Sequence, residues 1–324
     1  MDLLRILRSK IDVLEEGDYI PGLRAVLLHI ETASRHLLRG QEQEDETAFT
    51  DAIYRTNQAF EGSIKEAYRV LAERDPERKR PFDIENFFEK NSIFRQRVLA
   101  QFTNYRTGWR NPSVHDYKLD FDESEAFLAI ASVTAFACLV LDQITEKTSY
   151  LQAKSEADTK QVEIQERLAS VENSDLLSRT VQILREFSHQ QSSFNINGSK
   201  QTEVQVIGQL AGFFASAAPD LEVLSEYKIS SEAPARADFI ISDNSSRVVI
   251  ELKRARSGRQ LIDTGVAQVE RYMLLSNINA AILFLFSELG DELDIQERNV
   301  SNIDGKMLIL QPEKLRPNGS GEVD

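Results

Sequence analysis

The sequence predicts a chain of two parts, an all-α N-terminal half and a C-terminal α/β domain with a mixed sheet. Three observations lead to this prediction. Residues 20–144 repeat apolar side chains at helical spacing, residues 145–173 are polar and lack Gly and Pro, and the last third alternates helical segments with short apolar runs. We expect domains at residues 1–148 and 195–324, joined by an exposed helical linker over 149–194.

Four segments of the N-terminal half carry apolar residues along one helix face, which predicts a helical bundle. They are residues 20–38, 47–73, 83–102 and 123–144. The last segment is apolar on nearly every face, so we expect it to be the central helix of the bundle. Cys138 lies within it and is expected to be a small buried hydrophobe. Residues 103–124 are rich in turn formers and predict a loop.

The last third changes from helices to a mixture of helices and strands. The expected helices are 174–191, 202–218 and 263–277, and the expected strands are 221–229, 237–242, 247–252, 280–286 and 306–312. The second and third strands are expected to form a hairpin around Asp243–Ser246. The tail, residues 315–324, is expected to be frayed.

Composition limits the classes of function. The net charge of −14 argues against a protein that coats nucleic acid, but it leaves room for a nuclease with a local basic strip. One cysteine cannot form an intrachain disulfide, and together with four scattered histidines it does not complete a zinc cage. The N-terminus lacks a signal-peptide core, and no apolar run is expected to reach the roughly 18 residues of a membrane helix. We therefore expect a cytoplasmic protein that does not enter a membrane.

An acidic and a basic residue end the strand predicted at 247–252. Glu251 and Lys253 are two positions apart, so their side chains point to the same side of the strand. In one interpretation the pair simply faces solvent. In the other it meets Asp238, which begins the neighbouring strand; we do not expect Asp238 directly opposite Glu251, so a bulge or sheet twist would have to bring them together. Two carboxylates at one point favour a hard divalent cation, Mg²⁺ or Mn²⁺.

Three further residues extend this set. Glu203, at the start of the helix that precedes the sheet, is expected to supply a third acid. Gln268 and Tyr272 are four residues apart and share one face of the helix that follows Lys253.

The order of these residues resembles the PD-(D/E)XK nuclease superfamily, the fold of many restriction enzymes, in its Mrr-type branch with a Gln-x-x-x-Tyr signature. The matching positions within residues 195–310 are Glu203, Asp238, Glu251, Lys253, Gln268 and Tyr272. Ala237 departs from the family pattern, in which proline often precedes the Asp. The resemblance implies metal-dependent phosphodiester hydrolysis, with Asp238 and Glu251 as ligands of Mg²⁺ or Mn²⁺ and Lys253 positioning the attacking water.

A basic stretch follows the Glu-x-Lys triplet. Arg254, Arg256 and Arg259, with Tyr272, are expected to contact nucleic acid, and the arginines to hold backbone phosphates. An ordinary solvated loop is the open alternative. Residues Asn197–Lys200 lack the first glycine of a phosphate-binding loop, so we reject that interpretation.

A second motif precedes the most apolar helix. Arg110, Asn111 and His115 resemble the motif of the HEPN domain, a helical family with many toxin and defence ribonucleases, over residues 20–148. The resemblance implies metal-independent RNA cleavage, in which His115 transfers a proton, Arg110 stabilises the phosphorane and Asn111 orients the phosphate or His115. It also implies a homodimer that pairs two motifs. The alternative for His115 is a histidine bonded to its own loop.

Other charged residues of this half have simpler explanations. Glu61 and Lys65 lie one helical turn apart and are expected to form a surface ion pair, with a role in the RNA cleft as the alternative. His29 and His36 share one face of an amphipathic helix and are expected to be structural.

The two resemblances together predict a two-domain nuclease acting on DNA, RNA or both, and by family analogy one that serves prokaryotic antiviral or anti-plasmid defence. Two alternatives stay open. The helical half could be only a dimerisation scaffold for a DNase, or the whole chain could be a non-enzymatic sensor of DNA ends.

Overall fold

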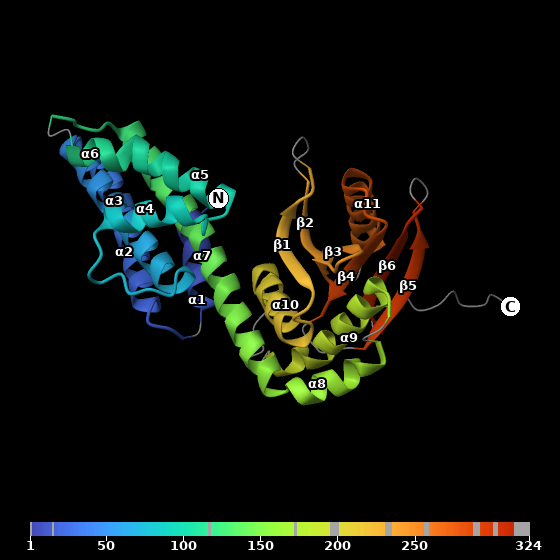
Figure 1. Cartoon of the computed structure of the whole chain (residues 1–324). Helices are drawn as coiled ribbons and strands as arrows, with labels where there is room; N and C mark the ends of the chain where they lie inside the picture. The colour runs from blue at the N-terminus through green and yellow to red at the C-terminus, as the bar shows by residue number, and fades with distance from the viewer. Residues whose placement is uncertain are drawn as a thin grey trace. The chain divides into compact units, whose positions relative to one another are not determined.

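The computed structural model describes residues 2–14, 16–115, 118–171, 174–194, 201–230, 235–255, 259–287, 292–300 and 304–313 (Figure 1). The chain divides into two units, Met1–Lys147 and Thr148–Asp324. The helices that begin in the first unit are α1 (Leu3–Asp12), α2 (Ile20–Gln43), α3 (Thr47–Leu71), α4 (Pro81–Asn91), α5 (Gln96–Tyr105), the π-helical turn η1 (Arg106–Arg110), α6 (Asn111–His115) and α7 (Glu123–Thr159).

Aromatic rings form the centre of the first unit. The ring centroid of Phe60 in α3 lies 5.5 Å from that of Phe102 and 4.8 Å from that of Tyr105, both in α5, and 5.1 Å from that of Phe136 in α7. All four side chains are completely buried. The helical prediction for this half is therefore confirmed, with large rings supplying much of the buried apolar surface that holds the helices together.

Three local predictions in this half were wrong. Helix α1 was not predicted, although Leu7 and Ile11 are buried one turn apart on its inner face. The segment predicted as one helix over 83–102 is interrupted at Ser92, whose φ of 52° lies in the left-handed region and ends α4. The predicted loop is helical from residue 103 through His115.

Helix α7 contradicts the prediction that no apolar segment reaches the length of a membrane helix. It contains an 18-residue window that is apolar enough to cross a membrane by length and composition, whereas we expected no such run. Its inward side chains, including Val133, Phe136, Val140 and Ile144, are completely buried in the first core. Burial in a protein core accounts for the apolar character of this face.

The second unit contains a six-stranded mixed sheet with helices on both faces. Its helices are α8 (Gln161–Leu168), the 3₁₀ turn η2 (Ala169–Val171), α9 (Leu176–Phe194), α10 (Glu203–Ala217) and α11 (Arg259–Ser276), and its strands are β1 (Glu222–Lys228), β2 (Arg236–Ser242), β3 (Arg247–Arg254), β4 (Ala280–Phe286), β5 (Leu293–Asn299) and β6 (Lys306–Pro312). The strand order is β1-β2-β3-β4-β6-β5. Strands β3, β4 and β6 are parallel, and the other neighbours are antiparallel. The predicted mixed sheet is confirmed.

The two faces of the sheet have separate cores. One core joins Phe239, Ile250 and Phe284 to side chains of α9 and α10, and the other joins Val249 and Leu283 to side chains of α11. Figure 1 shows α10 and α11 on opposite sides of the strands. The hairpin predicted around Asp243–Ser246 is present, with Ser242 opposite Arg247.

The predicted exposed linker is instead largely part of the second unit. Ile164, Leu184 and Phe187 are completely buried in the same core as the sheet, so the polar residues of this region cover one outer surface only. The last turns of α7 also pack closely on α10, because a Cβ at Gly212 would lie 2.2 Å from the carbonyl oxygen of Tyr150. Such an approach of two backbones requires glycine.

Strand β5 was not predicted. It pairs with β6 at the edge of the sheet and is mostly exposed beyond Leu293. Its charged and polar residues are typical of an edge strand, where they prevent pairing with other chains. Because of these residues, the segment lacks the alternation of apolar and polar residues that predicts a strand. The predicted frayed tail lies outside the described residues.

Candidate functional sites

The register of β2 and β3 brings the two predicted acids of the second unit together. Phe239 and Ile250 are the last paired residues at this end of the β2–β3 ladder, and Asp238 and Glu251 are the residues that follow them on the two antiparallel strands. The backbone N–H of Leu252 donates a hydrogen bond of 2.7 Å to Asp238 Oδ2. Asp238 and Glu251 are not among the paired residues of the ladder, in line with our expectation that they would not pair directly opposite.

Lys253 completes the triplet on the same face of β3. Its ammonium donates a 2.5 Å hydrogen bond to Glu251 Oε1. The Glu251 residue is 1% exposed and the Lys253 side chain 22% exposed. The interpretation in which this pair simply faces solvent is therefore wrong.

Helix α11 covers this face of the sheet with the other predicted pair. The Gln268 amide donates a hydrogen bond of 2.5 Å to the Tyr272 hydroxyl. Tyr272 is close enough to feel the charges of Asp238 and Glu251, which help burial to raise its pKa. Glu203, the first residue of α10, also acts electrostatically on both carboxyl groups, so the six predicted positions converge on one region of the second unit.

The protonation of this site reflects crowding of negative charge. Burial, followed by the charge of Glu251, raises the pKa of Asp238 well above its usual range. Burial also raises the pKa of Glu251, and the hydrogen bond with Lys253 opposes that rise. Burial by itself would lower the pKa of Lys253, but its contacts with Glu251, Asp238 and Glu203 outweigh burial and raise it. The two carboxyl groups therefore hold protons more tightly than free acids do, because burial and the charges of neighbouring acids disfavour the charged forms.

The donor atoms fit a hard divalent cation. Glu251 Oε2 is buried and accepts no hydrogen bond from any residue that the structure describes, which is costly for a carboxylate oxygen. Within the described ranges, no three His, Cys, Asp or Glu side chains are grouped to hold a metal. Mg²⁺ needs only one or two carboxylates when water and substrate oxygens complete its octahedron, so Asp238 and Glu251 suffice.

The basic stretch after Lys253 is only partly described. The guanidinium of Arg254 lies 5.8 Å from the ring centroid of Phe286, a cation–π distance. Arg256 lies outside the described residues, and so does the side chain of Arg259, whose backbone begins α11. The phosphate-contact prediction stays open for both, and the rejected phosphate loop, residues 197–200, also lies outside the described part.

The HEPN-like motif of the first unit lies on a helix with a local π-helical turn. The backbone N–H of Asn111 bonds to the carbonyl of Arg106, five residues earlier, and not to the residue four earlier. Pro112 follows at once and lacks the N–H that a regular helix would use. A π-helical turn lets the helix pass this proline without breaking, and such turns are frequent at functional sites.

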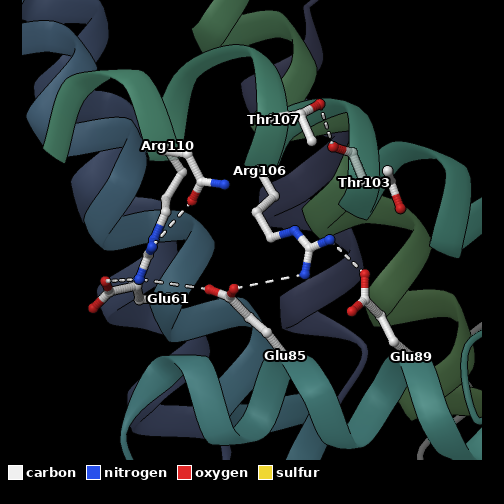
Figure 2. A network of polar contacts seen from close by, with 8 residues as sticks. Glu61, Glu85, Glu89, Thr103, Arg106, Thr107 and Arg110 are labelled. Carbon is white, nitrogen blue, oxygen red and sulfur yellow. Dashed lines mark hydrogen bonds and ion pairs between the residues drawn. The ribbon is translucent and has the colours of Figure 1, made fainter. Parts of the chain in front are cut away.

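Arg110 is held by acidic side chains of α3 and α4, as Figure 2 shows. Its Nη2 lies 3.7 Å from Oε1 of Glu85 and 4.0 Å from Oε1 of Glu61, and its Nη1 donates a 3.1 Å hydrogen bond to Asn111 Oδ1. Glu61 therefore faces Arg110, where we expected an ion pair with Lys65. The backbone of His115 ends α6, but its side chain lies outside the described residues.

A buried polar network fixes α6 on α3. The Asn57 amide donates 2.7 Å to the Ser113 hydroxyl, which in turn donates 3.1 Å to the carbonyl of Arg110. The Tyr105 hydroxyl lies 3.0 Å from Asn57 Oδ1 and 2.7 Å from the hydroxyl oxygen of Thr56, so its single proton is shared between these two acceptors. These bonds anchor the turn that carries Arg110, and they explain why the segment is helical despite its turn-forming residues.

Three residues near Arg110 were not predicted from the sequence: Asn57, Glu85 and Arg106. Asn57 interrupts the apolar stripe of α3, and Glu85 lies between the apolar residues Ile84 and Phe88 of α4. A polar or charged residue on an otherwise buried stripe is the signal that could have revealed both. Arg106 precedes Arg110 by four residues, which predicts a shared helix face.

No protein-family model, no curated protein and no solved structure matches this chain. The resemblances to the two nuclease families therefore rest on the residues described above.

Proposed function

We propose that the chain is a nuclease whose second unit hydrolyses phosphodiesters with a divalent cation, in the manner of the PD-(D/E)XK superfamily. The observation that supports this proposal is the proximity of Asp238 and Glu251 at the end of the β2–β3 ladder, where each acts on the pKa of the other. Lys253 is bonded to Glu251, and one oxygen of Glu251 has no hydrogen-bond partner among the described residues. A structural ion pair needs only one acid. A second acid in the same buried place destabilises the fold unless a cation or a proton compensates it.

The side chains divide the work of hydrolysis between them. Asp238 and Glu251 would hold the cation, which would supply a lowered pKa for the attacking water and positive charge for the phosphate. Lys253 is kept charged and oriented by Glu251, so its ammonium positions the water and stabilises the negative charge of the transition state. Gln268 and Tyr272 line the α11 side of the site, and Glu203 adds a third acid at the start of α10.

We infer a second activity, metal-independent RNA cleavage, for the first unit. Arg110 ends the π-helical turn, where acids of α3 and α4 hold its guanidinium. Asn111 accepts a hydrogen bond from Arg110 and begins the short helix whose backbone ends at His115. Arg110 stabilises the charge that develops on the phosphate while His115 transfers a proton to or from the attacking 2′-hydroxyl or the leaving oxygen. By family analogy the motif works in a homodimer, and the protein serves antiviral or anti-plasmid defence.

Cleavage assays of the full chain test the metal-dependent site. Glu251→Ala and Lys253→Ala should lower cleavage of DNA in Mg²⁺ or Mn²⁺ by roughly 100-fold or more, because each removes charge stabilisation at the reacting phosphate. Lys228→Ala, an exposed lysine of β1, is the matched control and should retain activity. Full activity of either site variant would refute the assignment, and binding of DNA ends without any cleavage would favour the sensor.

The same preparation tests the RNA site in EDTA. Single-stranded RNA should be cut to 2′,3′-cyclic phosphate ends, and His115→Ala or Arg110→Ala should slow this roughly 10²- to 10⁴-fold. DNA cleavage in Mg²⁺ should be unaffected by both changes. If EDTA stops all RNA cleavage, the first unit is a scaffold and the chain is a DNase.

A further inference from the structure

One carboxylate of the first unit lies between two arginines and almost out of reach of solvent. Glu85 in α4 is 2% exposed. Its Oε1 lies 3.7 Å from Nη2 of Arg110 and its Oε2 lies 3.9 Å from Nη1 of Arg106 (Figure 2). A second acid, Glu89, takes the other side of Arg106 with a 2.5 Å hydrogen bond.

The two acids of α4, Glu85 and Glu89, contact the arginines in different ways. Glu89 is hydrogen-bonded to Arg106 and its side chain is 36% exposed, which describes an ordinary surface ion pair. Glu85 is buried and reaches both guanidinium groups at ion-pair distance, while its Oε1 accepts no hydrogen bond from the residues that the structure describes. A carboxylate placed to fasten two elements would be expected to form hydrogen bonds with them.

The geometry limits what Glu85 can do. At 2% exposure its carboxylate cannot touch an RNA strand, so it is no catalytic residue. The Arg110 side chain is 15% exposed, and its Nε is likewise buried without an acceptor in the described part of the chain. Hydrogen bonds of this kind are often long before substrate binds and tighten in the complex. The buried charge therefore constrains the orientation of Arg110, whose side chain keeps a 15% exposed part that a phosphate can approach.

We propose that Glu85 is a positioning residue, which holds the guanidinium of Arg110 in the orientation that receives the phosphodiester. This inference rests on the proposed RNA-cleaving function, whereas the hold on Arg110 can be measured without it. Burial raises the pKa of Glu85, and the charges of Arg110 and Arg106 oppose that rise. Because Arg106 contacts the same carboxylate, it fixes the spacing between the two arginines.

Arginine modification by phenylglyoxal, mapped by mass spectrometry on the full chain, measures the hold directly. In Glu85→Gln, Arg110 should react about tenfold faster than in the wild type, since loss of one buried charged contact changes a local opening equilibrium by about that factor. In Glu89→Gln, the matched control on the same helix, only Arg106 should react faster. Arg95, which pairs with Glu146 in the same unit, should keep its rate and so reports intact folding.

RNA cleavage in EDTA measures the consequence. Glu85→Gln should lower kcat roughly 10- to 100-fold while KM stays near the wild-type value, because a misplaced group costs transition-state stabilisation and not ground-state binding. Glu85→Asp restores the charge one methylene further away and should give an intermediate kcat. A general loss of folding would instead lower the fraction of active enzyme, and it would raise the modification rates of Arg95 and Arg110 together.

The outcomes separate this inference from the proposed function. An unchanged Arg110 modification rate in Glu85→Gln, or an unchanged kcat, would overturn the positioning role even if the wild type cuts RNA. A wild type that does not cut RNA in EDTA would refute the proposed activity, and faster modification of Arg110 would then still support the hold of Glu85 on it. If Arg95 also reacts faster in Glu85→Gln, that variant is unfolded, and Glu85→Asp decides by the same two measurements.

Discussion

At the scale of single residues, the ionised carboxylate of Asp238 lowers the stability of the second unit, because it is buried close to other acids. Burial raises the pKa of its carboxyl group, and the charges of Glu251 and Glu203 add to this effect. A folded-state pKa above the unfolded value means that the folded protein binds the proton more tightly. The stability contributed by this proton is fully present below the unfolded pKa, and it is lost as the pH rises through the folded pKa.

Asp238→Asn should therefore stabilise the second unit at pH 8 in EDTA and flatten the dependence of its unfolding free energy on pH above the unfolded pKa of Asp. A rise of about 2–4 °C in melting temperature would correspond to about 1 kcal/mol in a unit of this size. Thermal unfolding by circular dichroism at several pH values measures the effect. Added Mg²⁺ should stabilise the wild type and not the variant, because binding to the folded state alone raises stability.

Asp243→Asn provides the control of opposite sign. Backbone hydrogen bonds from Ser245 and Ser246 lower the pKa of the exposed Asp243, so its stabilisation is present above the unfolded pKa and lost as the pH falls through the folded pKa. This variant should gain no stability at pH 8. An equal gain in both variants would contradict the explanation by site-specific crowding of charge.

Asn57 tests the polar network that fixes α6. Asn57→Ala removes the hydrogen bonds to Ser113 and Tyr105, and it should destabilise the first unit by about 1–3 kcal/mol, since buried partners lose their bonds. Trp109, the single tryptophan, lies in this unit with its ring centroid 5.8 Å from that of Tyr105, so urea unfolding followed by its fluorescence reports this unit. RNA cleavage should fall as well. Asn104→Ala, an exposed asparagine of α5, should change neither by more than about 0.5 kcal/mol.

At the scale of elements, the register of β2 against β3 and the approach of α10 to α7 decide where the second unit places its acids. Gly212 allows the backbone of α10 to contact that of α7, because any Cβ would lie 2.2 Å from the carbonyl oxygen of Tyr150. Glu203 is the first residue of the same α10, and Thr202 caps it through a hydrogen bond with the backbone of Gln205. Displacing α10 would therefore move Glu203.

Gly212→Ala should destabilise the second unit by roughly 1–3 kcal/mol or more, because a backbone contact cannot relax as a flexible side chain can. Circular dichroism should show the loss, while the Trp109 fluorescence transition of the first unit stays in place. Gly108→Ala is the matched control, because its Cβ would meet nothing within 4 Å. In a helical position it should gain up to about 1 kcal/mol. A similar loss in both variants would exclude close helix packing as the cause.

At the scale of the whole molecule, each unit has its own core and its own candidate chemistry. The proposed RNA site needs a second copy of the first unit, and α7 exposes Phe127 by 59% and Leu128 by 51% within that unit. Large exposed apolar residues of this kind are typical of contact surfaces when they are adjacent. We therefore expect pairing through this end of α7.

The full chain of 36.8 kDa should scatter light as a dimer, with two-fold symmetry. Phe127→Asp combined with Leu128→Asp should yield a monomer that no longer cuts RNA but still cuts DNA in Mg²⁺. Val162→Asp alters a residue that is 75% exposed in the second unit and should leave the dimer intact. A wild-type monomer with full RNA cleavage would contradict the pairing of motifs.

The sequence alone determined the elements whose apolar pattern is strong and local. The amphipathic helices of the first half, the buried strands β3 and β4 and the helical face shared by Gln268 and Tyr272 follow from periods of 3.6 and 2 residues. The residue types at Asp238 and Glu251 predicted a pair of carboxylates for a divalent cation, and the hydrolysis that the family resemblance implies stays a prediction. These features depend on residues that are close together in the chain, so they can be predicted from the order of residues alone.

Only the tertiary structure decided which distant residues meet. It placed Asp238 close to Glu251 and Glu85 between Arg106 and Arg110. It also kept residues 106–115 helical with the help of the buried hydrogen bond from Asn57 to Ser113. It showed as well that residues of the predicted linker, such as Ile164 and Phe187, are buried in the core of the second unit. Each of these results depends on contacts between residues that are far apart in the chain, where the packing of neighbouring elements outweighs local preference.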